Sequence, residues 1–131
     1  MSDIEALTKL VTQFRDDRNW KQFHNLKDLI ISLNLEASEL LELTQWKGEA
    51  GMAQARSEPQ FQQALEEECA DVLLYLLLIA QESGIDLAAA AKAKIAKNAL
   101  RYPIAAAFGS SRKYTALDAD QKTADGAGET V

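Results

Sequence analysis

The most constraining feature of this 131-residue sequence is a run of nine apolar residues, Val72 to Ala80. The run lies among strong helix formers, and as a helix it is apolar on every side. A bilayer-spanning helix needs about 20 apolar residues, so this run is too short to cross a membrane. We therefore expect a soluble helix that other helices must cover.

Apolar residues spaced three and four apart predict four helices, over residues 3–18, 26–44, 57–83 and 86–102. Asn25 is a suitable N-cap, Pro59 suits a first helical turn, and Gly84 suits a left-handed stop. Residues 45–57 are interpreted as a long connection with at most a short helical turn. The sequence thus predicts an all-α, four-helix domain over residues 1–108 and a disordered tail over residues 109–131.

Four helices in about 100 residues bury little core, and one chain can hardly cover an all-apolar helix. We expect a homo-oligomer, a dimer or a tetramer, that completes the bundle through helix faces. The single cysteine, Cys69, and an N-terminus without a signal-peptide pattern favour the cytoplasm. The formal net charge of −6 argues against a nucleic-acid partner.

Two expected helices each carry a pair of acids three residues apart. Glu36 lies within the apolar stripe of the second helix, and Glu39 neighbours it on the surface. Glu68 lies within the stripe of the third helix, and Asp71 follows three residues on. Burying ionised carboxylates without a partner is costly, and converging acids repel one another. A divalent cation resolves that conflict, and all-oxygen ligands select Mg²⁺, or alternatively Mn²⁺, over zinc. A half-exposed acidic face remains the alternative.

Four segments carry a family resemblance: residues 18–24 (RNWKQFH), residues 36–47 (EASELLELTQWK), residues 71–76 (DVLLYL), and residues 94–98 (KIAKN) followed by residues 101–103 (RYP). In this order they resemble the MazG-like all-α nucleoside triphosphate pyrophosphatases, in particular the dCTP pyrophosphatase branch. The resemblance covers roughly residues 7–103.

The resemblance implies a fold, a reaction and a site. It implies a MazG-like bundle that hydrolyses a deoxynucleoside triphosphate to its monophosphate and pyrophosphate, with dCTP or a modified dCTP as the first expected substrate and dATP as the second. The implied Mg²⁺ ligands and catalytic acids are Glu36, Glu39, Glu68 and Asp71, with Glu39 as the candidate general base. The implied substrate-binding residues are Trp20, His24, Trp46, Tyr75, Lys94, Asn98 and Arg101.

Several alternatives remain open. The aromatic residues can serve core packing alone, His24 can serve as a helix cap, and Lys94, Asn98 and Arg101 can form an ordinary polar stripe on one helix face. A phosphoribosyl-ATP-type pyrophosphatase keeps the same fold and metal with another substrate, although the two tryptophans speak against it. A non-catalytic helical interaction module is the alternative from a different class.

Overall fold

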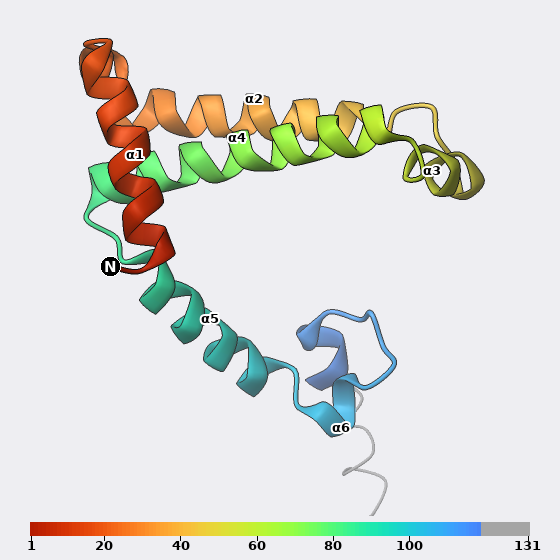
Figure 1. The fold of residues 1–131 in the computed structure, drawn as a ribbon. Helices are drawn as coiled ribbons and strands as arrows, with labels where there is room; N and C mark the ends of the chain where they lie inside the picture. Colours follow the sequence, from red (N-terminus) through yellow and green to blue (C-terminus); the bar gives the residue numbers. More distant parts are fainter. Residues whose placement is uncertain (119–131) are drawn as a thin grey trace, which may run out of the picture. The chain divides into compact units, whose positions relative to one another are not determined.

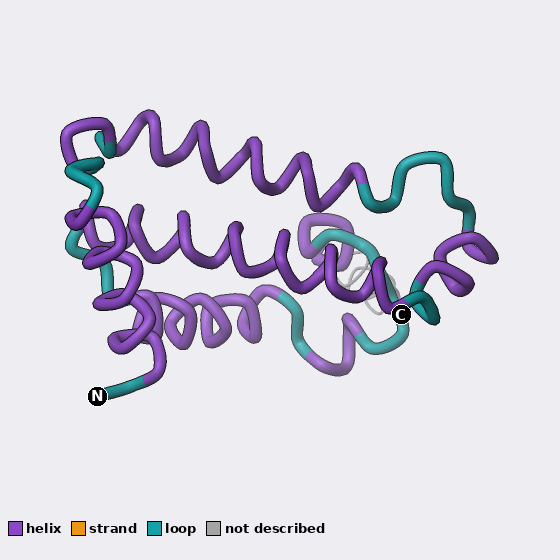
Figure 2. The backbone as a smooth tube through the Cα atoms, turned by 45° about the horizontal axis from the view of Figure 1, so that its top comes forward, coloured by secondary structure: helices purple, strands orange, loops and turns teal. Residues whose placement is uncertain are grey.

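The structure, a computed structural model, describes residues 1–118. Its helices are α1 (Asp3–Asp17), the 3₁₀ helix η1 (Lys21–Phe23), α2 (Leu26–Glu42), α3 (Glu49–Ala55), α4 (Pro59–Ser83), α5 (Leu87–Arg101) and α6 (Ile104–Ala107), and residues 114–118 are also helical. Figure 2 shows helix and loop throughout this described part, without a strand. The all-α prediction is therefore confirmed.

The predicted start and stop signals act as expected. The side chain of Asn25 accepts a hydrogen bond from the Asp28 backbone N–H at 2.9 Å, which caps α2. Pro59 occupies the first turn of α4, and Gly84 ends that helix with a φ of 64°. Ser2 and Glu5 also form a reciprocal capping box at the start of α1, which the sequence prediction did not include.

Residues 1–87 form one compact unit. Within it, α2 and α4 lie side by side and run in opposite directions, and α1 packs against α4 (Figure 1). Leu29 of α2 and Leu77 of α4 are the most buried large side chains, and Val11 and Leu78 complete this core. The antiparallel α2–α4 pair is what places acids from two distant parts of the sequence opposite one another.

The apolar run of α4 is only partly covered within this chain. Leu77, Leu78 and Ala80 are buried as predicted, whereas Leu73 and Leu76 of the same helix stay exposed. No single helix in the described residues is long and apolar enough to cross a membrane. The bent pair α4 and α5 meets the criteria of length and composition only when the two helices are counted together.

The predicted connection over residues 45–57 contains more helix than expected. Residues 49–55 form the two-turn helix α3, and Ala55 is buried. Gly48 precedes the helix without a side-chain cap, so the usual sequence signal for a helix start is missing. This explains why the pattern was interpreted as a loop.

Residues 88–118 belong to a second unit. In its described part, the ring of Tyr114 packs edge-to-face on Tyr102 at 6.0 Å, and Arg101 stacks on Tyr114 at 5.0 Å. Leu117 is buried. Residues 114–118, inside the predicted tail, are thus helical and contribute packing through Tyr114 and Leu117. The domain limit at residue 108 stays a prediction. The rest of the predicted tail, residues 119–131, lies outside the described residues.

Candidate active site

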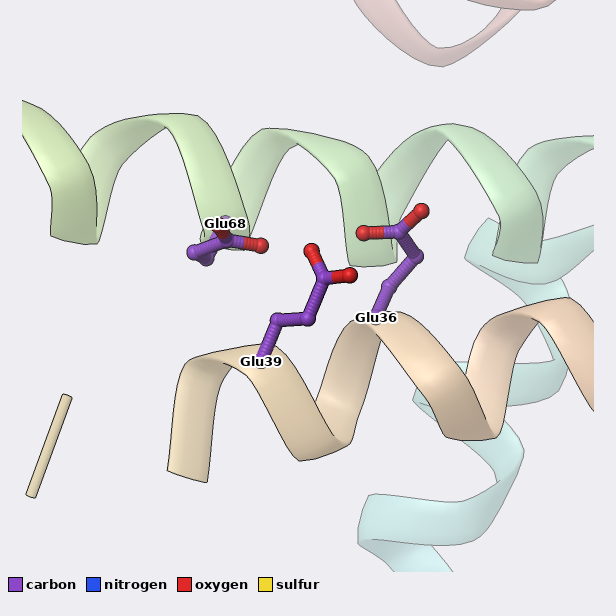
Figure 3. A group of neighbouring side chains, drawn as sticks. All are labelled: Glu36, Glu39 and Glu68. Carbon is purple, nitrogen blue, oxygen red and sulfur yellow. The ribbon is translucent and has the colours of Figure 1, made fainter. Parts of the chain in front are cut away.

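Three acids from two helices converge in the middle of the α2–α4 pair. Glu36 and Glu39 project from α2 toward Glu68 of α4 (Figure 3), and one carboxylate oxygen of each lies within 4.8 Å of the others. Glu36 and Glu68 are half-buried, and Glu39 is exposed. We call these three residues the acidic group. The spacing of the acids on the two helices predicted this convergence.

The acidic group contains two carboxylate oxygens that receive no hydrogen bond from a donor among the described residues. Glu36 Oε2 and Glu68 Oε2 are shielded from solvent and accept no hydrogen bond from the described residues. Burial, and then the negative charge of Glu39, raises the pKa of both the Glu36 and the Glu68 carboxyl above the ordinary value. Among the described residues, no neighbouring cation stabilises the charged form of these two carboxyls.

Asp71 belongs to the same region as the acidic group. It lies three residues beyond Glu68 on α4, and its charge contributes to the raised pKa of both Glu36 and Glu68. Asp71 also lines a cavity next to the acidic group. Asp71 therefore lies close enough to affect both carboxyls and lines the cavity, but it is not one of the three acids whose oxygens lie within 4.8 Å of one another.

A divalent cation fits this set of residues. The two shielded oxygens have no partner among the described residues, and burial, followed by the nearby negative charges, raises the pKa of both carboxyls. Hard carboxylate oxygens without His or Cys are the ligands that Mg²⁺ and Mn²⁺ prefer. The described residues therefore offer a metal-binding group of the predicted chemistry.

The cavity has a volume of about 460 Å³ and lies between α1, the η1 region and α4. Three of the predicted substrate-binding residues, Trp20, His24 and Tyr75, line it together with Asp71. The remaining wall consists of Leu7, Leu10, Val11, Phe14, Arg15, Leu74 and Leu78. A flat aromatic ring with polar edges suits such a space, because most of the wall is aliphatic or aromatic and a few polar groups can fix its orientation.

Arg15 is a cavity residue that the sequence prediction missed. It is only 7% exposed, and its Nε donates a hydrogen bond of 2.7 Å to Asp16 Oδ1. Across the same cavity, His24 Nδ1 is shielded and has no hydrogen-bond partner in the described part of the chain. Burial, and then the charge of Arg15, lowers the pKa of His24. A usable signal existed, because Arg15 lies four residues after Val11 and continues the apolar stripe of α1, as Glu36 does on α2.

The sequence profile described as the MazG-like family matches residues 31–117. This chain belongs to the MazG-like family. The match contains all four predicted metal-ligating acids and Tyr75, but it begins after α1 and η1. The Arg15, Trp20 and His24 side of the cavity therefore lies outside the part that the family profile covers.

Individual relatives of this MazG-like protein cover more of the chain. It is 40% identical to human dCTP pyrophosphatase 1 and 39% identical to the rat protein of that name, in each case over 114 residues. Each alignment spans 87% of this chain and 67% of the relative. The crystal structure of a pyrophosphatase from Archaeoglobus fulgidus DSM 4304 matches with a TM-score of 0.71 and 35% identity, covering 79% of this chain and 94% of the other.

Trp46 is the predicted site residue that the structure places away from the cavity. It follows α2, is 95% exposed, and has a φ of 64°, which is rare for a bulky residue. Its role in binding the substrate stays a prediction.

Lys94, Asn98 and Arg101 belong to the second unit of this MazG-like protein. All three lie on α5, where their spacing places them on one helix face, with Lys94 and Asn98 exposed and Arg101 half-buried. Their contact with a phosphate likewise stays a prediction.

Proposed function

We propose that this MazG-like protein is a metal-dependent nucleoside triphosphate pyrophosphohydrolase. It hydrolyses a deoxynucleoside triphosphate, with dCTP or a modified dCTP as the first substrate and dATP as the second. The observation that carries this proposal is that Asp71 both acts electrostatically on the acidic group and lines a cavity with aromatic side chains. The names of the dCTP pyrophosphatase 1 relatives support the same reaction and substrate.

The reaction consumes one water molecule. The water oxygen bonds to the α-phosphorus, the bond from that phosphorus to the bridging α–β oxygen breaks, and pyrophosphate leaves the monophosphate behind. Mg²⁺, with Mn²⁺ as the alternative, supplies charge neutralisation of the phosphates and lowers the pKa of bound water when it is present. Glu36, Glu39, Glu68 and Asp71 are the residues that would hold it.

The residues of the chain divide the remaining work between them. Glu39 is the exposed member of the acidic group, so it can meet water from solvent and serve as the general base. Trp20 and Tyr75 offer their rings to the base and sugar, since stacking on aromatic rings stabilises a nucleobase by about 1–3 kcal/mol. Lys94, Asn98 and Arg101 provide donors for phosphate oxygens in this proposal.

Oligomerisation is part of the proposal. Leu73 and Leu76 on α4 and Leu35 and Leu41 on α2 are exposed large apolar side chains, and Trp46 is almost fully exposed. Covering such side chains against other copies of the chain supports the expected dimer or tetramer, in the cytoplasm. Light scattering on the purified protein tests this assembly, and a monomer would contradict it.

The reaction is tested by incubating the protein with each of the eight common ribo- and deoxynucleoside triphosphates, with and without Mg²⁺, and separating the products. Metal-dependent release of a monophosphate and pyrophosphate is expected, with dCTP ranked first. Release of orthophosphate would contradict the bond assignment. Adding phosphoribosyl-ATP to the panel separates the alternative pyrophosphatase, and an interaction module would give no turnover and no stabilisation by Mg²⁺ and nucleotide.

A further inference from the structure

Arg15 is a buried cation whose hydrogen-bonding capacity is mostly unused. A guanidinium carries five N–H donors. The Nε donor of Arg15 is bonded to Asp16, but neither Nη1 nor Nη2 has a hydrogen-bond partner among residues 1–118. The side chain is more than nine-tenths buried and lines the cavity. The two Nη groups are not shielded atoms, since they are open to the cavity, so an occupant with acceptor atoms can receive hydrogen bonds from them.

The position of Arg15 indicates which part of a nucleotide it meets. Asp71, Tyr75 and Leu78 line the cavity along α4, and a rise of 1.5 Å per residue places Leu78 about 10 Å beyond Asp71. A nucleotide whose phosphates lie at the acidic group extends its sugar and base along this wall. Arg15 faces the space from α1, with Trp20 and His24 as neighbouring lining residues. The aromatic rings in this lining suit a base rather than a phosphate.

The donors of Arg15 distinguish among bases. A guanidinium donates through two parallel N–H groups and accepts nothing, so it matches two adjacent acceptors. Cytosine presents such a pair in O2 and N3, and guanine presents one in O6 and N7. Each acceptor of adenine neighbours an amino group or a C–H group, and in thymine an N–H donor separates the two carbonyl groups.

We propose that Arg15 sets the base specificity of this site by donating from Nη1 and Nη2 to two adjacent acceptors, which are O2 and N3 of cytosine in dCTP. The inference rests on the proposed function, because it takes the cavity as the base-binding part of that site. It also locates the specificity outside residues 31–117, the part that the MazG-like profile covers.

The test measures kcat and KM of the wild type, Arg15→Gln and Arg15→Lys for dCTP, dGTP, dATP and dTTP. Arg15→Gln should lower kcat/KM for dCTP roughly 10- to 100-fold, the range for a lost bidentate contact to a base. The loss should fall mainly on KM, since the contact is made equally in the ground and transition states. For dATP, kcat/KM should hardly change. Arg15→Lys keeps the positive charge but not the two parallel N–H donors, so it should recover only part of the kcat/KM for dCTP that Arg15→Gln loses.

Lys9→Gln is the matched control, because Lys9 is an exposed cation on the same helix and does not line the cavity. It should leave the preference for dCTP unchanged. A wild-type preference for dGTP over dCTP would overturn the assignment of the Arg15 donors to O2 and N3 of cytosine. A wild-type preference for dATP or dTTP, or an equal loss for all four substrates in Arg15→Gln, would overturn the inference.

A second measurement needs no variant of the protein. In 3-deaza-dCTP a C–H group replaces the N3 acceptor, so the wild type should use it at least about 10-fold less well than dCTP. Arg15→Gln should not distinguish the two nucleotides. Equal wild-type activity on both would overturn the inference even if Arg15→Gln failed to fold. Absence of turnover with every nucleotide would instead refute the proposed function.

Discussion

The acidic group and the cavity differ in the kind of polar atom they present, which is an acceptor in the first and a donor in the second. In the acidic group, acceptors converge without donors, and the two shielded oxygens of Glu36 and Glu68 have no partner in the described chain. In the cavity, Arg15 presents Nη donors that have no acceptor among the described residues, and most of the surrounding wall is apolar. One region needs a cation, and the other needs a flat group with acceptor atoms. A nucleotide with its metal ion meets both requirements, because the metal ion binds the acids and the base offers acceptor atoms to Arg15.

The two regions also differ in how widely they are shared. All four acids lie within residues 31–117, which match the MazG-like profile, whereas α1 and η1 lie before it. This division is what we expect if the family shares phosphate chemistry and varies the base. Variants that change only one of the two regions should therefore have separable effects.

The largest effect is expected from Glu39→Gln. Removing the general base and one metal ligand should lower kcat roughly 1,000-fold, within the range for acid–base catalysis, while the fold and the oligomer persist. Turnover under saturating Mg²⁺ and dCTP is the measurement. Glu42→Gln is the control, since Glu42 is an exposed acid one turn further along α2. If Glu39→Gln kept its activity, Glu39 would not belong to the reacting end of the site.

Trp20→Ala tests the cavity without touching the acids. Loss of a stacking ring should raise KM for dCTP roughly 10-fold and leave kcat within about threefold of the wild type. Steady-state kinetics beside Phe23→Ala checks this, because Phe23 is an exposed aromatic nearby that does not line the cavity. A fall in kcat with an unchanged KM would show that the two regions do not divide their work as described.

Glu36→Gln should have opposite effects on the metal-free and metal-bound protein. It removes one charge from a cluster of like charges, so the melting temperature without metal should rise by roughly 2–6 °C. The further rise on adding Mg²⁺ should disappear, because a ligand stabilises only the state that binds it. Differential scanning fluorimetry with and without Mg²⁺ makes the comparison. A lower melting temperature without metal would show that Glu36 is stabilised by contacts other than a cation.

The smallest effect is a difference in the pH dependence of stability without metal. The pKa of Glu36 is raised, so the folded state binds a proton at this carboxyl more tightly than the unfolded state does. The resulting contribution to folding stability is lost as pH rises from about 4.5 through the raised pKa. The pKa of His24 is lowered, so the neutral imidazole stabilises the folded state above pH 6.5, and this stabilisation is lost as pH falls through the lowered pKa.

Urea unfolding of Glu36→Gln and His24→Asn across this pH range measures the two contributions. Relative to the wild type, the plot of unfolding free energy against pH should be flatter above about pH 4.5 for Glu36→Gln and flatter below pH 6.5 for His24→Asn. Parallel profiles for all three proteins would contradict the assigned pKa directions.

The sequence predicted the acids better than it predicted the cavity, and the reason is physical. Glu36 and Glu68 lie inside apolar stripes, so their inward direction follows from helix spacing alone. Arg15 obeys the same rule, but its partners across the cavity come from the η1 region and α4, and only the packing of α1 on α4 brings them together. Trp46 was assigned by resemblance, and no spacing rule predicts the left-handed backbone that places it outside the cavity.

The most direct test of the central claim is binding by calorimetry of α,β-methylene-dCTP, in which the scissile bond is blocked, with and without Mg²⁺, beside the nucleoside deoxycytidine. If the acidic group holds the phosphates through a metal and the cavity holds the base, Mg²⁺ should tighten binding of the triphosphate analogue at least about 10-fold. It should leave the weaker binding of deoxycytidine unchanged. Equal affinity for the analogue with and without Mg²⁺ would contradict the account.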